Sequence, residues 1–196
     1  MQAFGAGCAL GAVYVGLILV ASMASDDVLL GIGENKYFCA IDCHIAYSVV
    51  GVTTGGTLAD NGGVLEADGR FYVVTLRTWF DEKTTSSRRG NGVLYPDPRV
   101  AIVVDDEGHF YPASVPAMQA LGSRARTSIS FGSPLRPGES YETTLVFDVP
   151  LAAGNARLLV RDRRADSIFM VGHENSPFHG KVYFALRPAS LAAARR

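Results

Sequence analysis

The residues of this chain best suited to do chemistry lie together in the stretch CAIDCH. Cys39 and Cys43 are separated by three residues, and His44 follows Cys43 directly. Thiolate and imidazole groups bind copper and zinc, and two nearby thiols can also form a disulfide. The spacing therefore fits a metal site, a local disulfide, a pair of buried thiols or a redox pair.

A shared metal or a disulfide sets a geometric condition on the backbone between the two cysteines. In an extended strand, residues four apart in sequence lie about 13 Å apart, whereas a disulfide needs Cα atoms within about 7 Å. The chain must therefore turn between Cys39 and Cys43, and Asp42 would permit such a turn. Asp42 also opposes the lowered thiol pKa that thiol–disulfide exchange requires, so exchange is the least favoured of the four interpretations.

A second stretch, GHENSPFHG, offers a further metal ligand near the end of the chain. It contains two of the four histidines, His173 and His179, on a predicted loop. The first and last strands of a β-sandwich can lie near one another, so His179 could approach the cysteines. A copper site would then use Cys39, Cys43, His44 and His179. The alternatives are a Cys39–Cys43 disulfide, which an oxidising compartment favours, and a hydrogen-bonded histidine loop.

The elements that must position these residues begin with an uncharged N-terminal stretch, AFGAGCALGAVYVGLILVASMA, at residues 3–24. A helix of about 20 apolar residues crosses the ~30 Å hydrocarbon core of a bilayer. The small residues before Ser25 would suit a cleaved secretory signal, but no basic residue precedes the apolar run. We interpret residues 1–24 as a membrane anchor or signal segment, and favour an uncleaved transmembrane helix whose partner is the lipid bilayer.

Charge indicates on which side of the membrane the rest of the chain lies. Lys36 is the only basic residue between Ser25 and Gly69, whereas cytoplasmic flanks normally carry an excess of Lys and Arg. We therefore expect a single-pass protein of the cytoplasmic membrane with an extracytoplasmic (periplasmic or extracellular) C-terminal domain. The net charge is −1, from 18 basic and 19 acidic side chains without long like-charged runs, which argues against a nucleic-acid partner.

The remaining sequence is typical of short strands joined by turns. We predict strands at residues 36–50, 70–80, 100–113 (a hairpin turning at Gly108), 141–149, 156–162 and 181–187. The strand after the Pro137-Gly138 turn alternates apolar and polar residues, as a half-buried antiparallel strand does. By contrast, the glycine-rich composition of residues 52–63 predicts a loop. The pattern predicts an all-β, immunoglobulin-like antiparallel β-sandwich over residues 36–188, after a tether at 25–35 and before a C-terminal tail at 189–196.

Three motifs resemble the exported, immunoglobulin-like bacterial domains of unknown function often called telokin-like. They are a D-x-x-G-x-x-Y segment from Asp105 to Tyr111, the turn Pro137-Gly138-Glu139, and the strand end Val146-Phe147-Asp148-Val149-Pro150. The likeness covers about residues 70–162. It implies a small sandwich behind an anchor or signal, with no defined activity. The matched residues are turn and core residues, so the resemblance assigns no catalytic role.

No nucleophile elbow or phosphate-binding glycine loop is visible in the sequence. We therefore expect a non-enzymatic binding or interaction protein, whose partner is another envelope protein or a respiratory membrane complex. The alternative is a copper-binding or copper-delivery protein that uses the Cys-x3-Cys-His cluster.

Overall fold

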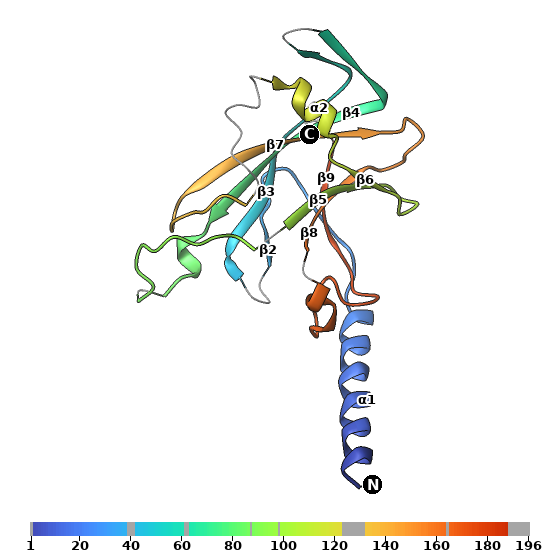
Figure 1. The fold of residues 1–196 in the computed structure, drawn as a ribbon, viewed down its shortest axis with the longest axis vertical. Coiled ribbons are helices and arrows are strands. Elements are labelled where there is room, and N and C mark those ends of the chain that lie inside the picture. The colour runs from blue at the N-terminus through green and yellow to red at the C-terminus, as the bar shows by residue number, and fades with distance from the viewer. Residues whose placement is uncertain are drawn as a thin grey trace, which may run out of the picture.

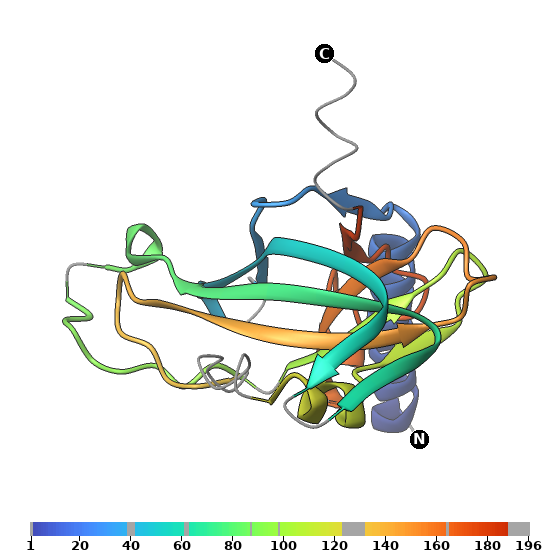
Figure 2. The same cartoon turned by 90° about the horizontal axis from the view of Figure 1, so that it is seen from above.

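The computed structural model describes residues 2–38, 42–60, 63–86, 88–97, 99–122, 132–163 and 165–187. They form two β-sheets, from which one long N-terminal helix, α1 (Gln2–Met23), projects (Figure 1). Seen from above, the long strands of one sheet run side by side (Figure 2).

The two sheets contain five and four strands. The order in the five-stranded sheet is β1 (Val28–Leu30), β9 (Val182–Ala185), β8 (Arg157–Asp162), β5 (Arg99–Val104) and β6 (Phe110–Pro112). The order in the four-stranded sheet is β2 (Lys36–Phe38), β3 (Asp42–Asp60), β4 (Gly63–Phe80) and β7 (Ser140–Val149). All pairs are antiparallel except β1 with β9, which run parallel. Strand β1 lies within the stretch that we interpreted as a tether.

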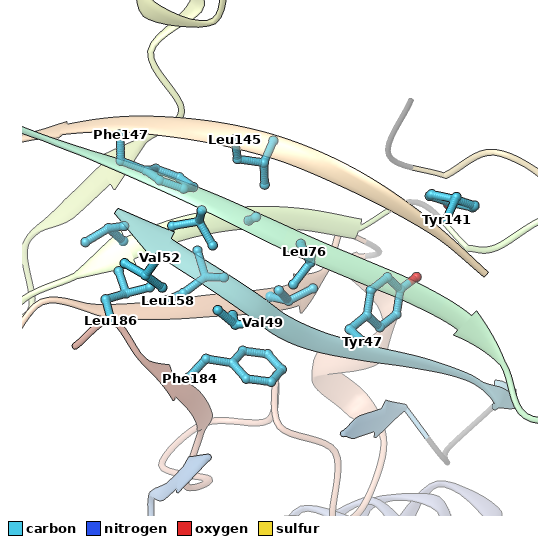
Figure 3. Packing of buried hydrophobic residues seen from close by; sticks show 14 of the residues in the cluster. Tyr47, Val49, Val52, Leu76, Tyr141, Leu145, Phe147, Leu158, Phe184 and Leu186 are labelled. Atoms are coloured by element: carbon cyan, nitrogen blue, oxygen red, sulfur yellow. The ribbon is translucent and has the colours of Figure 1, made fainter. Parts of the chain in front are cut away.

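The inner faces of the sheets meet in one apolar core, which confirms the β-sandwich. Strand β7 alternates as predicted and buries Tyr141, Thr143, Leu145, Phe147 and Val149. Figure 3 shows side chains of the four-stranded sheet packing against Leu158 and Phe184 of the five-stranded sheet. Burying such side chains is the dominant favourable term in folding, at about 1.5–3 kcal/mol for each fully buried large residue.

The predicted loop at 52–63 is wrong, because β3 and β4 extend as a long hairpin through most of these residues. Thr57 pairs with Glu66, and Asp60 pairs with Gly63. Glycine disfavours a strand only weakly, so hydrogen bonding to a neighbouring strand outweighs composition here. The ladder is irregular between Gly55 and Thr57, where the register shifts.

The predicted turns are confirmed, and one short helix was not predicted. Gly108 (φ 84°) turns the β5–β6 hairpin, and Gly138 (φ 82°) follows Pro137 in the turn before β7. Helix α2 (Val115–Ala120) begins at the N-cap Ser114, whose hydroxyl accepts from the amide of Ala117. Two 3₁₀ turns, η1 (Glu82–Thr84) and η3 (Ala165–Phe169), complete the described elements that matter for the site.

Helix α1 confirms a helical N-terminal segment and carries no charged residue. Its side chains are described from Gly7 onward. Large apolar side chains are exposed along it, among them Leu10, Val13, Val20 and Met23. Within the part of the chain that the structure describes, no helix reaches the length and apolarity needed to cross a membrane.

Candidate functional site

The cysteines of the predicted metal site cannot be placed against each other. Cys39 lies outside the described residues, as does the side chain of Cys43. The strands on either side are informative: β2 and β3 are antiparallel, and Phe38 is the register partner of Asp42. The chain therefore reverses direction between Phe38 and Asp42, as a metal or disulfide at this position requires. Disulfide, thiols and metal ligation all stay predictions.

The two candidate histidine ligands have separate neighbours. His44 stacks on Phe80 with ring centroids 5.7 Å apart, and its Nδ1 lies 2.7 Å from the hydroxyl of Thr84. His179 donates from Nδ1 to the carbonyl of Gly180 at 2.7 Å. Among the described residues, no group of three or more His, Cys, Asp or Glu side chains could hold a metal.

A feature that the sequence did not reveal is the burial of Lys36, which is 3% exposed. Its ammonium donates to the carbonyls of Val160 (2.5 Å) and Val182 (3.0 Å) and to the carboxylate of Glu174 (2.7 Å). Strands β8 and β9 pair at Leu158↔Phe184 and Leu159↔Tyr183. Val160 and Val182 would form the next pair in this register. Lys36 therefore binds both strands at the place where their pairing ends.

Lys36 belongs to a buried charge network with Glu174, Arg99 and Asp162. Burial lowers the pKa of Lys36, an effect that Glu174 opposes and the nearby Arg99 guanidinium reinforces. Arg99 lies over the ring of Phe38 and 3.3 Å from the carboxylate of Asp162. Each charge is stabilised by an opposite charge or by carbonyl groups, as buried ions require.

An open cleft lies on the outer face of the five-stranded sheet, at and beyond the last register pair of β8 and β9. Its volume is about 670 Å³, within the ~300–1,000 Å³ range of small-molecule sites. Apolar side chains of β5, β8 and β9 form its floor: Val100, Leu159 and Tyr183. Three cationic side chains also line it: Arg161, Arg163 and Lys181.

The described side chains that line the cleft carry a surplus of positive charge. The one carboxylate among them, Asp162, is buried and lies next to Arg99. Lys181 donates from Nζ to the carbonyl of Glu174 and from its backbone to the carboxylate of Asp27 at 2.7 Å. Burial lowers the pKa of Lys181. The charges of Glu174 and Asp27 oppose this lowering, and the neighbouring Arg161 adds to it. An anion in the cleft would relieve the repulsion between these cations.

The cleft lies at the corner of the molecule from which α1 emerges. The hydroxyl of Tyr14 on α1 donates to the carbonyl of Phe169 at 2.5 Å, and Ile168 beside it lines the cleft. At the other end of this loop, the amide of Gly180 donates to the hydroxyl of Ser25 at 2.8 Å. Figure 1 shows the η3 loop beside the upper part of α1. The loop also exposes large apolar side chains: Ile168, Phe169, Val171 and Phe178.

Comparison with known proteins gives distant structural likenesses. No protein-family model matches the chain, and no curated protein is similar enough in sequence to count as a relative. A conserved hypothetical protein from Bacillus anthracis is 15% identical, with a TM-score of 0.48 over 67% of this chain and 87% of its own. A secreted protein from Mycobacterium tuberculosis is 12% identical, with a TM-score of 0.48 over 83% of this chain and 99% of its own.

An uncharacterised β-sandwich protein from Clostridium difficile is 9% identical, with a TM-score of 0.43 over 83% of this chain and 96% of its own. With TM-scores below 0.5, the assignment of this chain to the β-sandwiches rests on its own two sheets and shared core.

Proposed function

We propose that this protein is a non-enzymatic binding module, an immunoglobulin-like β-sandwich that α1 holds at the extracytoplasmic surface of the cytoplasmic membrane. Its partner in this proposal is another envelope protein or a membrane complex. The two sheets of five and four strands support the immunoglobulin-like assignment, since variable-type domains have nine strands in two sheets.

The observation that carries the proposal is the apolar surface of α1. Leu10, Val20 and Met23 are 73%, 70% and 78% exposed, and the helix projects away from the sandwich (Figure 1). A contiguous exposed apolar surface marks a membrane or protein interaction site. The described part of α1 does not by itself reach the length and apolarity of a membrane span. The proposal takes all 22 residues of α1, about 33 Å at 1.5 Å per residue, as the segment that enters the ~30 Å hydrocarbon core.

Charge supports the extracytoplasmic orientation. The acidic residues Asp26 and Asp27 follow α1 directly, and Lys36, the one basic residue between Ser25 and Gly69, is buried in its ion pair. The sequence that directly follows the helix therefore carries little of the positive charge that marks cytoplasmic flanks.

Membrane fractionation of the full chain tests this proposal. We expect the protein to stay in the membrane pellet after alkaline carbonate extraction, and its sandwich to be digested when protease is added outside spheroplasts. Replacing both Leu10 and Val13, which are exposed near the middle of α1, by Lys should move the protein to the supernatant, because a charge at the bilayer centre costs about 2.5–3.5 kcal/mol. The matched control is Leu151→Lys, at an exposed loop residue of the sandwich. Extraction of the wild-type chain by carbonate would refute the anchoring.

Copper binding by Cys39, Cys43, His44 and His179 is the second candidate, favoured by the reversal of the chain between β2 and β3. Titration of the reduced full chain with copper should then give a stoichiometric thiolate charge-transfer band that is lost in Cys39→Ser. Absence of the band, together with a mass lower by two hydrogens, would establish the disulfide instead.

A further inference from the structure

We propose that the cleft binds the phosphate-bearing head group of an anionic membrane lipid. Arg161, Arg163 and Lys181 contact the phosphate, and the apolar floor accommodates the glycerol and the first acyl carbons. This inference rests on the proposed membrane anchoring, and it adds a ligand class to the sandwich that α1 holds at the bilayer.

The lining of the cleft is amphiphilic in the way that such a ligand requires. Val100, Leu159 and Tyr183 provide an apolar floor, and Phe110 and Ile168, both substantially exposed, provide further apolar surface. The cations follow the last register pair of β8 and β9, Leu159↔Tyr183, on both strands, and all three line the same cleft. A free inorganic anion would leave the apolar floor without a partner.

The charge of the cleft selects an anion. Asp162 already lies beside Arg99, and Asp27 accepts from the backbone of Lys181. Glu174 is committed to Lys36. The guanidinium groups of Arg161 and Arg163 are exposed, so they can reach a phosphate at little cost in desolvation.

The position of the cleft matches the depth of lipid phosphates. Asp27, which holds the backbone of Lys181, follows the last helical residue of α1, Met23, by only four positions. The head-group layer is about 5–8 Å thick on each side of the hydrocarbon core. If α1 fills the core, the cationic side chains of the cleft reach into the phosphate layer. The exposed Phe178, two residues before the Gly180 that bonds to Ser25, then faces the membrane interface, where aromatic rings are enriched.

Lipid selection by the full chain tests the inference. The protein is released from nanodiscs that contain equal amounts of phosphatidylglycerol and phosphatidylcholine, and native mass spectrometry identifies the lipid that stays bound. We expect one phosphatidylglycerol to be retained in preference to phosphatidylcholine. Replacing Arg161 and Arg163 by Gln should weaken this preference about fivefold for each cation removed. Because both side chains are exposed, the variant should melt at the wild-type temperature.

Two controls make the outcome decisive. Lys83→Gln removes an exposed cation in η1, outside the cleft, and should leave the preference unchanged. Equal retention of the two lipids by the wild-type chain, or an equal loss in Lys83→Gln, would overturn the inference. In a second arm, calorimetry with inorganic phosphate should show much weaker binding. Phosphate binding as tight as that of the lipid would identify a free-anion site and also overturn it.

The failure of this inference and that of the proposed function can be told apart. If the chain resists carbonate extraction but shows no lipid preference, the anchoring holds and the head-group site is refuted. If carbonate extracts the chain, yet phosphatidylglycerol stays bound through Arg161 and Arg163, the head-group site holds and the anchoring is refuted.

Discussion

The two faces of the five-stranded sheet are built from alternate residues of the same strands, yet they have different surroundings. The inner face contributes Ala101, Val103, Leu158, Val160 and Phe184 to the main core. The outer face carries an equally apolar set: Val100, Ile102, Val104, Leu159 and Tyr183. The inner set is closed by the four-stranded sheet, whereas the outer set borders the cleft.

This difference shows that the apolar character of a strand does not decide its role. An antiparallel sheet with one solvated face normally alternates apolar and polar residues. Strand β5, RVAIVV, is apolar on both faces, so its outer side needs a cover too. The folded chain buries Ile102, Val104, Leu159 and Tyr183, and only Val100 is partly exposed, where apolar floor and cationic side chains meet at the cleft.

The largest effect on the stability of the fold should come from replacing Lys36, which contacts β8 and β9 from the inner side of the sheet. We expect Lys36→Met to destabilise the fold by about 3–5 kcal/mol, because Glu174 would keep a buried charge without its partner. Urea unfolding of the full chain, followed by tryptophan fluorescence, measures this change.

The double variant Lys36→Met with Glu174→Met should recover part of the lost stability, since it removes both buried charges. Recovery should stay incomplete, because the carbonyls of Val160 and Val182 lose their donor. A loss below about 1 kcal/mol in the single variant would mean that the pair is solvated, contrary to the burial seen here.

Substitutions of two neighbouring leucines on β8 allow the stability contributions of the two faces to be compared directly. Leu158 is 0% exposed on the inner face and Leu159 is 4% exposed on the outer face. Leu→Ala in a closed core costs about 2–5 kcal/mol, depending on the cavity that remains. We expect Leu158→Ala near the top of this range and Leu159→Ala near its bottom, because the cleft lets water reach the space left by Leu159. Equal losses in urea unfolding would show that the outer face is as closed as the inner one.

A glycine next to the cleft tests how tightly the base of α1 packs. A Cβ at Gly180 would collide with the backbone of Asp26, whereas a Cβ at Gly63 would meet no atom within 4 Å. We expect Gly180→Ala to cost about 1–3 kcal/mol, as overpacking does, and to speed hydrogen exchange in β1. Gly63→Ala is the matched control. Unchanged exchange in Gly180→Ala would mean that the connection between α1 and the sheet moves aside freely.

Local signals predicted much of the fold. The strand that ends at Val149 alternates with period two, and Gly108 and Gly138 take the positive φ that their turns require. The hairpin extension at 52–63 was missed because pairing across strands, not composition, determines it. The Asn61-Gly62 dipeptide between the paired residues Asp60 and Gly63 is the hairpin signal that could have revealed it.

The cleft and the charge network could not be predicted, because they join residues far apart in sequence. Lys36 lies 138 residues from Glu174. Arg161 and Lys181 come together only through the register of β8 and β9. Cys39 and Cys43 stood out as candidate ligands because residue type and spacing are visible in the local sequence. The proposed site instead uses common residues whose placement depends on the sheet.

A pH-dependent effect on stability should come from Asp105, in the turn between β5 and β6. Its carboxylate accepts from the amides of Glu107 and His109, the His109 ring and the Tyr111 hydroxyl. Burial alone would raise the pKa of Asp105, but the hydrogen bonds from Tyr111 and His109 prevail and lower it from 3.8 to about 2. The charged form therefore stabilises the native state fully above about pH 4, and this contribution is lost as the pH falls through about 2.

Thermal melting between pH 2 and pH 5 checks this prediction. Asp105→Asn keeps the shape of the side chain but cannot ionise, so its melting temperature should depend less on pH in this range than that of the wild type. Asp106→Asn is the matched control at the adjacent residue. If the wild type and Asp105→Asn lose stability in parallel on acidification, the turn does not depend on the Asp105 charge. The β5–β6 turn would then differ from the Lys36 network, because only the network would depend on charge.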